Sequence, residues 1–389
     1  MKKLGLLPKL IIAIIIGIVV GAFTPEWFVR IFATFNSIFG GFLEFAIPLI
    51  IIGFVAPGIG DLGTGAGKLL AITAGIAYAS TIISGSLAYF TSSIVLPTFL
   101  KVGSLNISAS NPEEALLEPF FRIEMPPVFG VMTALLIAFT LGLGIAAIKG
   151  DVLKKLMKEF QEIIGKLIDN IIIPLLPLHI LGIFANMTYA GQVITILSVF
   201  SKVFIMVILL HITVLIIQFL IGGTVAGGNP IRLLKNMIPA YFTALGTQSS
   251  AATIPVTLEQ TKKNGVKDDI ADFVIPLCAT IHLSGSTTTL VSCSMAIMML
   301  NGMPVSFNLM LPFILVLGIT MVAAPGVPGG AVIAALGPLK TMLGFPQPML
   351  SLMIALYVAQ DSFGTATNVT GDGAIALIVN KISGNKLSK

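Results

Sequence analysis

Charged residues are scarce in this chain: they make up 10% of its 389 residues, whereas 56% of the residues are hydrophobic. The mean hydropathy is +1.02, which excludes an ordinary soluble globular protein. Apolar runs near the roughly 20 residues that cross a bilayer recur from end to end. Because helices satisfy their own backbone hydrogen bonds in lipid, the sequence predicts an all-α polytopic membrane protein.

Cysteine and arginine are also rare, which argues against a disulfide framework and against an arginine partner for a ligand in the C-terminal part. Cys278 and Cys293 share one apolar segment, so no disulfide framework is predicted. The only arginines are Arg30, Arg122 and Arg232, so the C-terminal part offers no guanidinium to a carboxylate ligand. The net charge of +5 does not indicate a nucleic-acid partner, because the basic residues gather at loops, as the positive-inside rule expects.

Hydropathy and segment length predict eight membrane-spanning helices, near 5–23, 27–56, 68–97, 127–149, 163–190, 195–223, 268–299 and 347–381. The loop at 98–125 is rich in glutamate and is placed outside, whereas the lysines of 149–166 and of the C-terminus are placed in the cytoplasm. The first span has no cleavage site and is predicted to be retained. A multi-pass protein of the inner (plasma) membrane with both termini in the cytoplasm is expected.

Two further apolar segments, 230–263 and 307–340, are each interrupted at the middle. The sequence "TALGTQSSAATIPVT" breaks the first and "MVAAPGVPGGAVIAAL" breaks the second. Each half is too short to cross a bilayer, so both segments are predicted to be re-entrant hairpins, which are tolerated only inside protein or along a wet cavity. Each hairpin precedes a helix with a polar middle, which is the pattern of an inverted repeat around a transport site.

The last predicted helix carries a polar stripe. Asp361, Thr365, Asn368 and Asp372 are spaced four, three and four residues apart, so a helix stacks them on one face. Helix-to-helix hydrogen bonding is the structural alternative for its threonines. Two carboxylates without a nearby Lys or Arg instead indicate a binding site, because an ionisable group in the bilayer is costly. The glycines of "NVTGDG" would permit local unwinding that frees carbonyls for a cation.

Histidines allow two interpretations. His282, in the polar "CATIHLSGSTTTL", either carries a proton or orients a carboxylate for transport, or it only bonds the backbone. His179 and His211 lie among aliphatic residues and are predicted to be packing residues.

The motifs "TIPVT", "PLCATIHLSGS", "PGVPGG" and "NVTGD" resemble the dicarboxylate/amino acid:cation symporter family, the glutamate-transporter homologues. The match is strong over 230–381 and rests mostly on hydropathy and helix count before residue 225. The resemblance implies eight spans with two re-entrant hairpins, a homotrimer and elevator-type transport. It assigns 1–67 and 98–190 to a scaffold, and 68–97, 195–223, 230–263, 268–299, 307–340 and 347–381 to a moving transport domain.

The resemblance also implies the site residues. Asp361 would hold the amino group of the substrate, while Asn368 and Ser250 would hold its α-carboxylate. The full substrate set is Ser249, Ser250, Gly326, Val327, Asp361, Gly364, Thr365 and Asn368. For Na⁺, Asp372 would act in a first site with carbonyls of Cys278, His282 and Asn368, and a second site would use carbonyls near Thr280, Met321, Val322 and Ala324.

Departures from the family pattern bear on ions and substrate. The "NMDG" of the family is "HLSG" here, so His282 and Ser284 replace the asparagine and aspartate of a third sodium site, whose hydroxyl ligands would be Ser80 and Thr81. The loss of that carboxylate predicts fewer coupled sodium ions, or a proton (H⁺) route through His282. Gly364 and Gln248 stand where members that take acidic substrates carry arginine, and both favour a neutral amino acid.

Sodium-coupled symport of a neutral amino acid in a lipid bilayer is therefore expected. Two alternatives stay open: a bulkier amino acid such as cystine, or a dicarboxylate with proton coupling. An ion channel would share the polar stripe but requires a continuous pore. An enzyme is not expected, since the sequence shows no H-E-x-x-H metal motif and no evident nucleophile–base pair.

Overall fold

The structure, a computed structural model, describes residues 6–61, 67–103, 117–148, 150–191, 193–321, 324 and 329–384. Within these ranges every regular element is a helix, which confirms the all-α prediction. The elements are α1 (Leu6–Phe23), α2 (Glu26–Asp61), α3 (Gly67–Val95), η1 (Leu96–Thr98), α4 (Val131–Ala147), α5 (Val152–Leu167), η2 (Ile168–Ile172), α6 (Ile173–Tyr189), α7 (Val193–Ala226), α8 (Pro230–Asn236), α9 (Ile238–Thr247), α10 (Ser250–Lys263), α11 (Asp268–Ile281), α12 (Ser284–Leu300), α13 (Phe307–Thr320), α14 (Gly330–Leu343) and α15 (Gln347–Ile382).

Five helices in the described part of the chain are long and apolar enough to cross a membrane, judged by length and composition. They are Glu26–Phe54, Leu69–Thr98, Val152–Tyr189, Phe200–Ala226 and Asp268–Leu300. Four shorter apolar helices accompany them, among them Phe307–Thr320 and Gly330–Leu343. The chain is thus a multi-pass membrane protein, and the count of eight spans stays a prediction.

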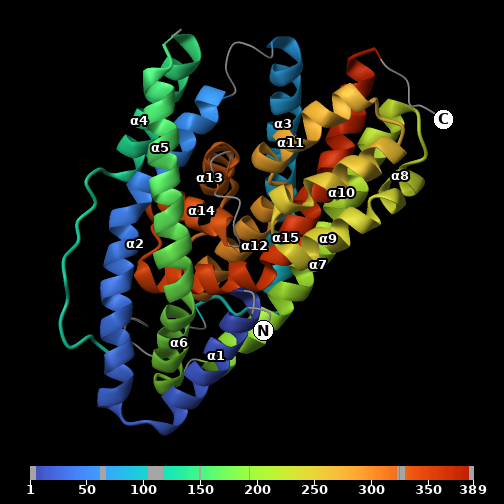
Figure 1. Ribbon diagram of the computed structural model, residues 1–389. Coiled ribbons are helices and arrows are strands. Elements are labelled where there is room, and N and C mark those ends of the chain that lie inside the picture. Colours follow the sequence, from blue (N-terminus) through green and yellow to red (C-terminus); the bar gives the residue numbers. More distant parts are fainter. Residues whose placement is uncertain are drawn as a thin grey trace, which may run out of the picture.

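The helices fall into two groups that contact mainly their own members. In one group α1 packs on α6, while α2 packs on α4, α5 and α6 (Figure 1). In the other, α15 crosses the middle of the molecule and contacts α7, α9, α11 and α12, and α12 also packs on α3. Helices α13 and α14 pack on each other near the centre.

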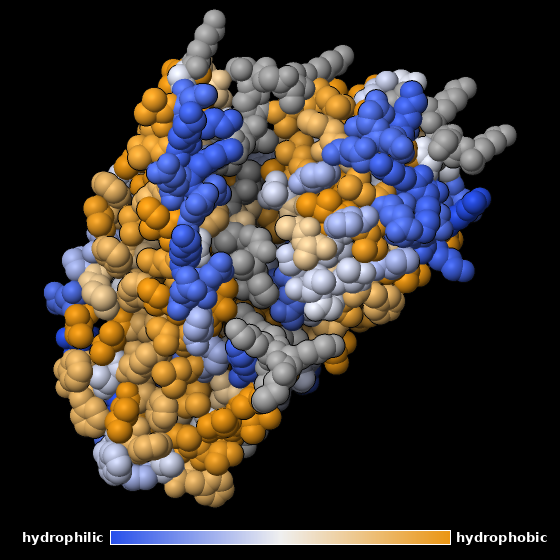
Figure 2. All heavy atoms as spheres, viewed as in Figure 1, coloured by the Kyte–Doolittle hydropathy of each residue, from blue (hydrophilic) through white to orange (hydrophobic). Residues whose placement is uncertain are grey.

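Hydrophobic side chains dominate the face drawn in Figure 2, while hydrophilic ones form a band over α5 and a patch over α8 and α10. Both hydrophilic regions lie toward the end of the molecule that holds the C-terminus. Large apolar residues are exposed on the outer faces of several helices, including Ile15 on α1, Leu136 on α4 and Ile205, Leu209 and Ile216 on α7. Such a surface is stable against lipid and not against water.

The predicted interruptions are real breaks. The first apolar segment forms α8, α9 and α10, and α9 and α10 pack on each other across the two-residue connection Gln248–Ser249. The second forms α13 and α14. The predicted seventh span also breaks, because the helix stops after Ile281 and resumes at Ser284. The lysine-rich stretch before the predicted fifth span is itself helical, as α5, and continues through η2 into α6.

The local unwinding that the glycines of "NVTGDG" would permit does not occur, because α15 is continuous from Gln347 to Ile382. The two glycines there serve close packing. A Cβ on Gly371 would lie 2.5 Å from Gln218 Oε1, and a Cβ on Gly373 would lie 2.8 Å from Met237 Cε. The glycines therefore let α7 and the first hairpin approach α15, instead of freeing carbonyls.

Candidate functional site

A cavity of about 40 Å³ lies where the α9–α10 tip, the α11–α12 break and the middle of α15 meet. Seven of the twelve described residues that line it were predicted from the sequence to bind substrate or sodium or to set selectivity. The lining comprises Gln248, Ser250, Ala279, Thr280, Leu283, Ser286, Ala324, Ala331, Tyr357, Asp361, Thr365 and Asn368. Segments that are far apart in the sequence thus supply one small polar chamber.

Among the described residues that line the chamber, Asp361 is the only acidic one, and it is buried with 4% of its surface exposed. Its Oδ2 accepts a hydrogen bond of 2.7 Å from the backbone N–H of Gly329, and its Oδ1 lies 3.5 Å from the Thr365 hydroxyl. Gly329 has a φ of +78°, a conformation that glycine adopts without a Cβ penalty. Asp361 therefore accepts a hydrogen bond at the start of α14, a position that favours negative charge.

Asn368 joins α15 to the α11–α12 break. Its Oδ1 accepts from the backbone N–H groups of Gly285 at 2.8 Å and Ser286 at 3.3 Å, and its Nδ2 donates to Ser286 Oγ at 2.9 Å. In an unbroken helix these two N–H groups would bond the carbonyls of Ile281 and His282. Asn368 caps α12 instead, so the carbonyls of Ile281 and His282 do not bond these two N–H groups. The second N–H of the Asn368 side-chain amide stays available to the chamber.

The tip between α9 and α10 is a tight connection held by its own side chains. Gln248 adopts a left-handed conformation with φ +54°, and Ser249 caps α10 by accepting from the N–H of Ala252 at 3.3 Å. The hydroxyls of Thr247 and Thr253 lie 3.1 Å apart across the connection. Ser250 lines the chamber and Ser249 does not, so the tip brings one of the two predicted serines to the site.

Asp372 faces a different neighbour from the rest of the polar stripe. Its Oδ1 lies 2.9 Å from Nδ1 of His282, and Nε2 of that ring lies 3.0 Å from Ser80 Oγ. Gln218 Nε2 contacts both Ser80 Oγ and Ser284 Oγ at 3.0 Å. We call these five residues the histidine cluster. Thr81, predicted as a further hydroxyl ligand, bonds Ala77 O on its own helix instead.

The structure describes some of the remaining residues that were predicted to bind a cation. Thr280 and Ala324 both line the chamber. Met321, three residues before Ala324, is buried, and its carbonyl accepts from the N–H of Ala324 at 3.0 Å. The carbonyl of Cys278 accepts from the N–H of His282 at 2.9 Å. Val322, Gly326 and Val327 lie outside the described residues. Hard oxygen donors of the kind that a sodium ion prefers are thus present around the break.

Gly364 is buried on the α15 face that crosses α12, and it is not among the residues that line the chamber. A Cβ there would lie 3.6 Å from the Ser286 backbone, which is ordinary contact. The opposite glycine is far tighter, because a Cβ on Gly285 would lie 2.5 Å from the carbonyl oxygen of Gly364. Gly364 therefore shapes the wall behind the site, not its open space.

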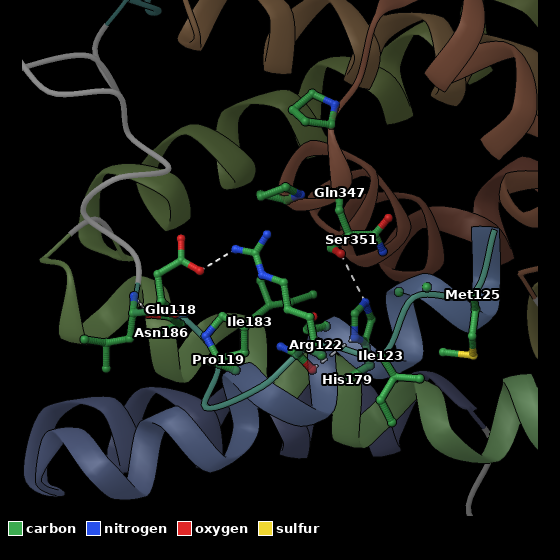
Figure 3. Close-up of a pocket in the computed structure, with 18 of the residues that line it drawn as sticks. Glu118, Pro119, Arg122, Ile123, Met125, His179, Ile183, Asn186, Gln347 and Ser351 are labelled. Atoms are coloured by element: carbon green, nitrogen blue, oxygen red, sulfur yellow. Dashed lines mark hydrogen bonds and ion pairs between the residues drawn. The ribbon is translucent and has the colours of Figure 1, made fainter. Parts of the chain in front are cut away.

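A larger cavity of about 690 Å³ contains none of the predicted site residues. It lies between α2, α6, the 117–126 segment and the start of α15, and Figure 3 shows Arg122 turned toward Glu118. His179 bonds Ser351 Oγ at 3.1 Å, and its Nδ1 lies 3.0 Å from the side-chain amide of Asn36. His179 thus joins α6 to α2 and α15. This agrees with the predicted packing role, because both ring nitrogens have partners inside the protein.

Three polar residues at these sites were missed by sequence reasoning. Tyr357 belongs to the same stripe, four residues before Asp361, and Ser286 directly follows the quoted "HLSG". Gln218 is the polar residue in the apolar run "VLIIQFLIGG". An isolated amide within a membrane-spanning run is a signal that could have identified it.

Comparisons with known proteins agree over nearly the whole chain. A model of the sodium:dicarboxylate symporter family matches residues 6–382. The serine/threonine transporter SstT of Streptococcus suis (strain 05ZYH33) is 28% identical over 342 residues, which cover 85% of this chain and 94% of that protein. The protein of the same name from Acinetobacter baumannii (strain AYE) is 27% identical, covering 95% of each chain. Excitatory amino acid transporter 2 of Mus musculus is 30% identical over 260 residues, 65% of this chain and 45% of that protein.

Proposed function

The chain belongs to the sodium:dicarboxylate symporter family, and on this premise we propose that it is a secondary active transporter that carries a neutral amino acid together with sodium. Asp361 would bind the ammonium group of the substrate. Asn368, through its second amide N–H, and Ser250 would bind the α-carboxylate. Thr365 would contact the substrate from the same face of α15.

One observation carries the choice of a neutral substrate: the chamber contains a carboxylate but no cationic side chain among the described residues that line it. A zwitterion brings one ammonium and one carboxylate, which match Asp361 and the neutral N–H and O–H donors. A second carboxylate would be buried without a partner, which costs several kcal/mol. The family name mentions dicarboxylates, but this chamber suits them poorly.

The small volume of the chamber, about 40 Å³, favours a short side chain over cystine. A compact polar substrate is also consistent with the two relatives named serine/threonine transporters. Hydroxyl and amide groups of Thr365, Ser286 and Gln248 line the chamber. They would favour a substrate whose side chain forms hydrogen bonds. We therefore propose a small neutral amino acid.

Sodium would bind where the break and α15 supply oxygen atoms. For the first site, Asp372 offers Oδ2 and the break offers the carbonyl of His282. The second site would use carbonyls of Thr280, Met321 and Ala324. A bound cation in these positions would offset the cost of the buried carboxylates.

Eight spans, two re-entrant hairpins, a homotrimer and an elevator motion complete the proposal. The division of the helices into two groups is what a scaffold and a moving domain would need, with α9–α10 and α13–α14 entering the moving part. A channel is less favoured, because it requires a continuous pore, whereas the α9–α10 tip, the α11–α12 break and the middle of α15 meet at a chamber of only about 40 Å³.

Uptake into proteoliposomes tests the function. Purified protein should accumulate a small neutral amino acid such as serine when an inward sodium gradient is imposed, and the accumulation should disappear without sodium. Glutamate, aspartate and cystine serve as comparison substrates. Sodium-independent uptake, or a preference for glutamate or aspartate, would contradict the proposal.

A further inference from the structure

The amide group of Gln218 occupies the centre of the histidine cluster. Its Nε2 lies 3.0 Å from Ser80 Oγ, 3.0 Å from Ser284 Oγ and 3.4 Å from His282 Nε2. These three groups come from α3, from α12 and from the break between α11 and α12, while Gln218 itself projects from α7. A single nitrogen therefore ties together four parts of the chain.

The atoms around this nitrogen are acceptors. His282 Nδ1 lies 2.9 Å from Asp372 Oδ1, and in the imidazole tautomer that donates from Nδ1 to this carboxylate, Nε2 carries a lone pair. The two serine oxygens also have lone pairs. An amide NH₂ has two donors and a partial positive charge, and here it is surrounded as a small cation would be. Among the described residues, Gln218 Oε1 has no hydrogen-bond partner, so the amide is held through its nitrogen.

Close packing keeps the amide in place. Gln218 is buried with 8% of its surface exposed, and Gly371 permits its approach to α15, since any Cβ there would meet Gln218 Oε1 at 2.5 Å. On the other side lies a cavity of about 180 Å³ that is lined by residues of α3, α7 and α15, which are aliphatic except for Ser80, Ser84 and Gln218. A mostly aliphatic lining of this kind disfavours the entry of a hydrated ion from that side.

We propose that the amide of Gln218 permanently fills the position of a third cation, so that the cluster of Ser80, Ser284 and His282 binds no sodium ion. A cation contacting the same three acceptors would overlap the amide nitrogen, so the two are mutually exclusive. The inference rests on the proposed sodium-coupled transport and specifies its coupling: the cations bind only at the other sites. Gln218 is thus a residue that sets the number of coupled ions.

Gln218→Glu tests the proposal directly, because it keeps the shape and replaces the donor with a carboxylate oxygen. With the hydroxyls of Ser80 and Ser284, that oxygen would create a cation site. The sodium-to-substrate ratio, measured in proteoliposomes from the membrane potential at which net flux stops, is expected to be higher by one sodium ion in the variant than in the wild-type protein. Gln360→Glu is the matched control: it adds the same charge at a buried glutamine that lies on α15 instead of α7. It should leave the sodium-to-substrate ratio unchanged.

A second readout does not depend on transport. Sodium is titrated against the thermal unfolding of purified protein without substrate, and Gln218→Glu should show a steeper sodium dependence, with a Hill coefficient higher by about one. If that variant does not fold, Gln218→Ala decides, since removal of the amide should leave a protein whose stability depends more strongly on sodium.

Equal coupling ratios and equal sodium dependence in the wild type and Gln218→Glu would overturn the inference, as would a Gln218→Ala protein with wild-type stability and sodium response. Failure of the proposed function has a different signature: the wild-type protein would show no sodium-driven uptake of any neutral amino acid. The thermal titration still reports on the cluster in that case.

Discussion

At the scale of single residues, the site is defined by how each polar side chain of α15 finds a different partner. Asp361 meets the start of α14, Asn368 meets the start of α12, and Asp372 meets His282. The four-residue spacing of the stripe aligns these groups along one helix, but the neighbouring elements decide their roles. Asp361, Thr365 and Asn368 reach the chamber, as does Tyr357 one turn earlier, whereas Asp372 is not among the described residues that line it.

Asp361→Asn is expected to reduce the apparent affinity for the amino acid on the order of 100-fold. The substitution keeps an acceptor for the Gly329 N–H but removes the charge that pairs with the ammonium, and a charge-assisted hydrogen bond contributes about 1.5–3 kcal/mol. Concentration-dependent uptake measures the change. Asp272→Asn, at a half-exposed aspartate that pairs with Lys262 at 2.8 Å, is the matched control and should transport normally. Wild-type affinity in Asp361→Asn would refute the assignment.

Asn368→Asp separates a structural from a binding role at one position. The carboxylate still accepts from Gly285 and Ser286, so α12 keeps its cap, yet it would repel the α-carboxylate of the substrate. Uptake should therefore be lost although α12 stays capped. Asn368→Ala should lose both, with a decrease of about 1–2 kcal/mol in the free energy of unfolding, as is typical of a lost cap. Thermal unfolding and uptake are measured on both variants, and substantial uptake by Asn368→Asp would contradict the binding role.

At the scale of elements, the crossing of α12 and α15 fixes the chamber, and it depends on small residues. Gly285 leaves no room for a side chain, because a Cβ would lie 2.5 Å from Gly364 O and 2.6 Å from Thr367 Cβ. Gly364 faces the same crossing with ordinary contact distances. Of these two glycines on facing helices, Gly364 therefore has room for a Cβ and Gly285 does not.

The same substitution at both positions gives a direct comparison. Gly285→Ala should destabilise the protein by about 1–3 kcal/mol, because overpacking a close contact forces α12 away from α15. Gly364→Ala should be tolerated and is its control. Thermal unfolding of the purified variants measures the difference. Similar stabilities for the two variants would show that the crossing is looser than these distances indicate.

Much of this arrangement follows from the sequence, and the rest depends on tertiary contacts. Periodicity predicted the stripe, and the interrupted segments predicted α9–α10 and the α13–α14 pair. The break at His282 and Leu283 could not be located, since it arises because Asn368, far away in sequence, takes the N–H groups that would continue the helix. The unwinding that Gly371 would permit does not occur for a related reason: that glycine makes room for Gln218, which the pattern of α15 alone cannot reveal.

At the scale of the whole molecule, the two helix groups meet through a few polar contacts as well as apolar packing. His179 is the clearest of them, because it holds Asn36 of α2 and Ser351 of α15 while being 1% exposed itself. If α15 belongs to a moving domain and α6 to a scaffold, this contact must break in every transport cycle. An elevator motion thus requires the hydrogen bond between His179 and Ser351 to break and to form again.

A reversible cross-link between α6 and α15 tests that motion. In a protein with Cys278 and Cys293 replaced by serine or alanine, the pair His179→Cys and Ser351→Cys should be bridged by a mercuric ion, because the native side chains lie 3.1 Å apart. Bridging is expected to stop sodium-driven uptake, while a thiol reductant that removes the metal should restore it. Each single-cysteine protein, treated identically, is the control and should keep its activity. Uptake that continues in the bridged protein would mean that α15 does not move against α6, and the elevator would have to be replaced by a mechanism in which only the hairpin tips open.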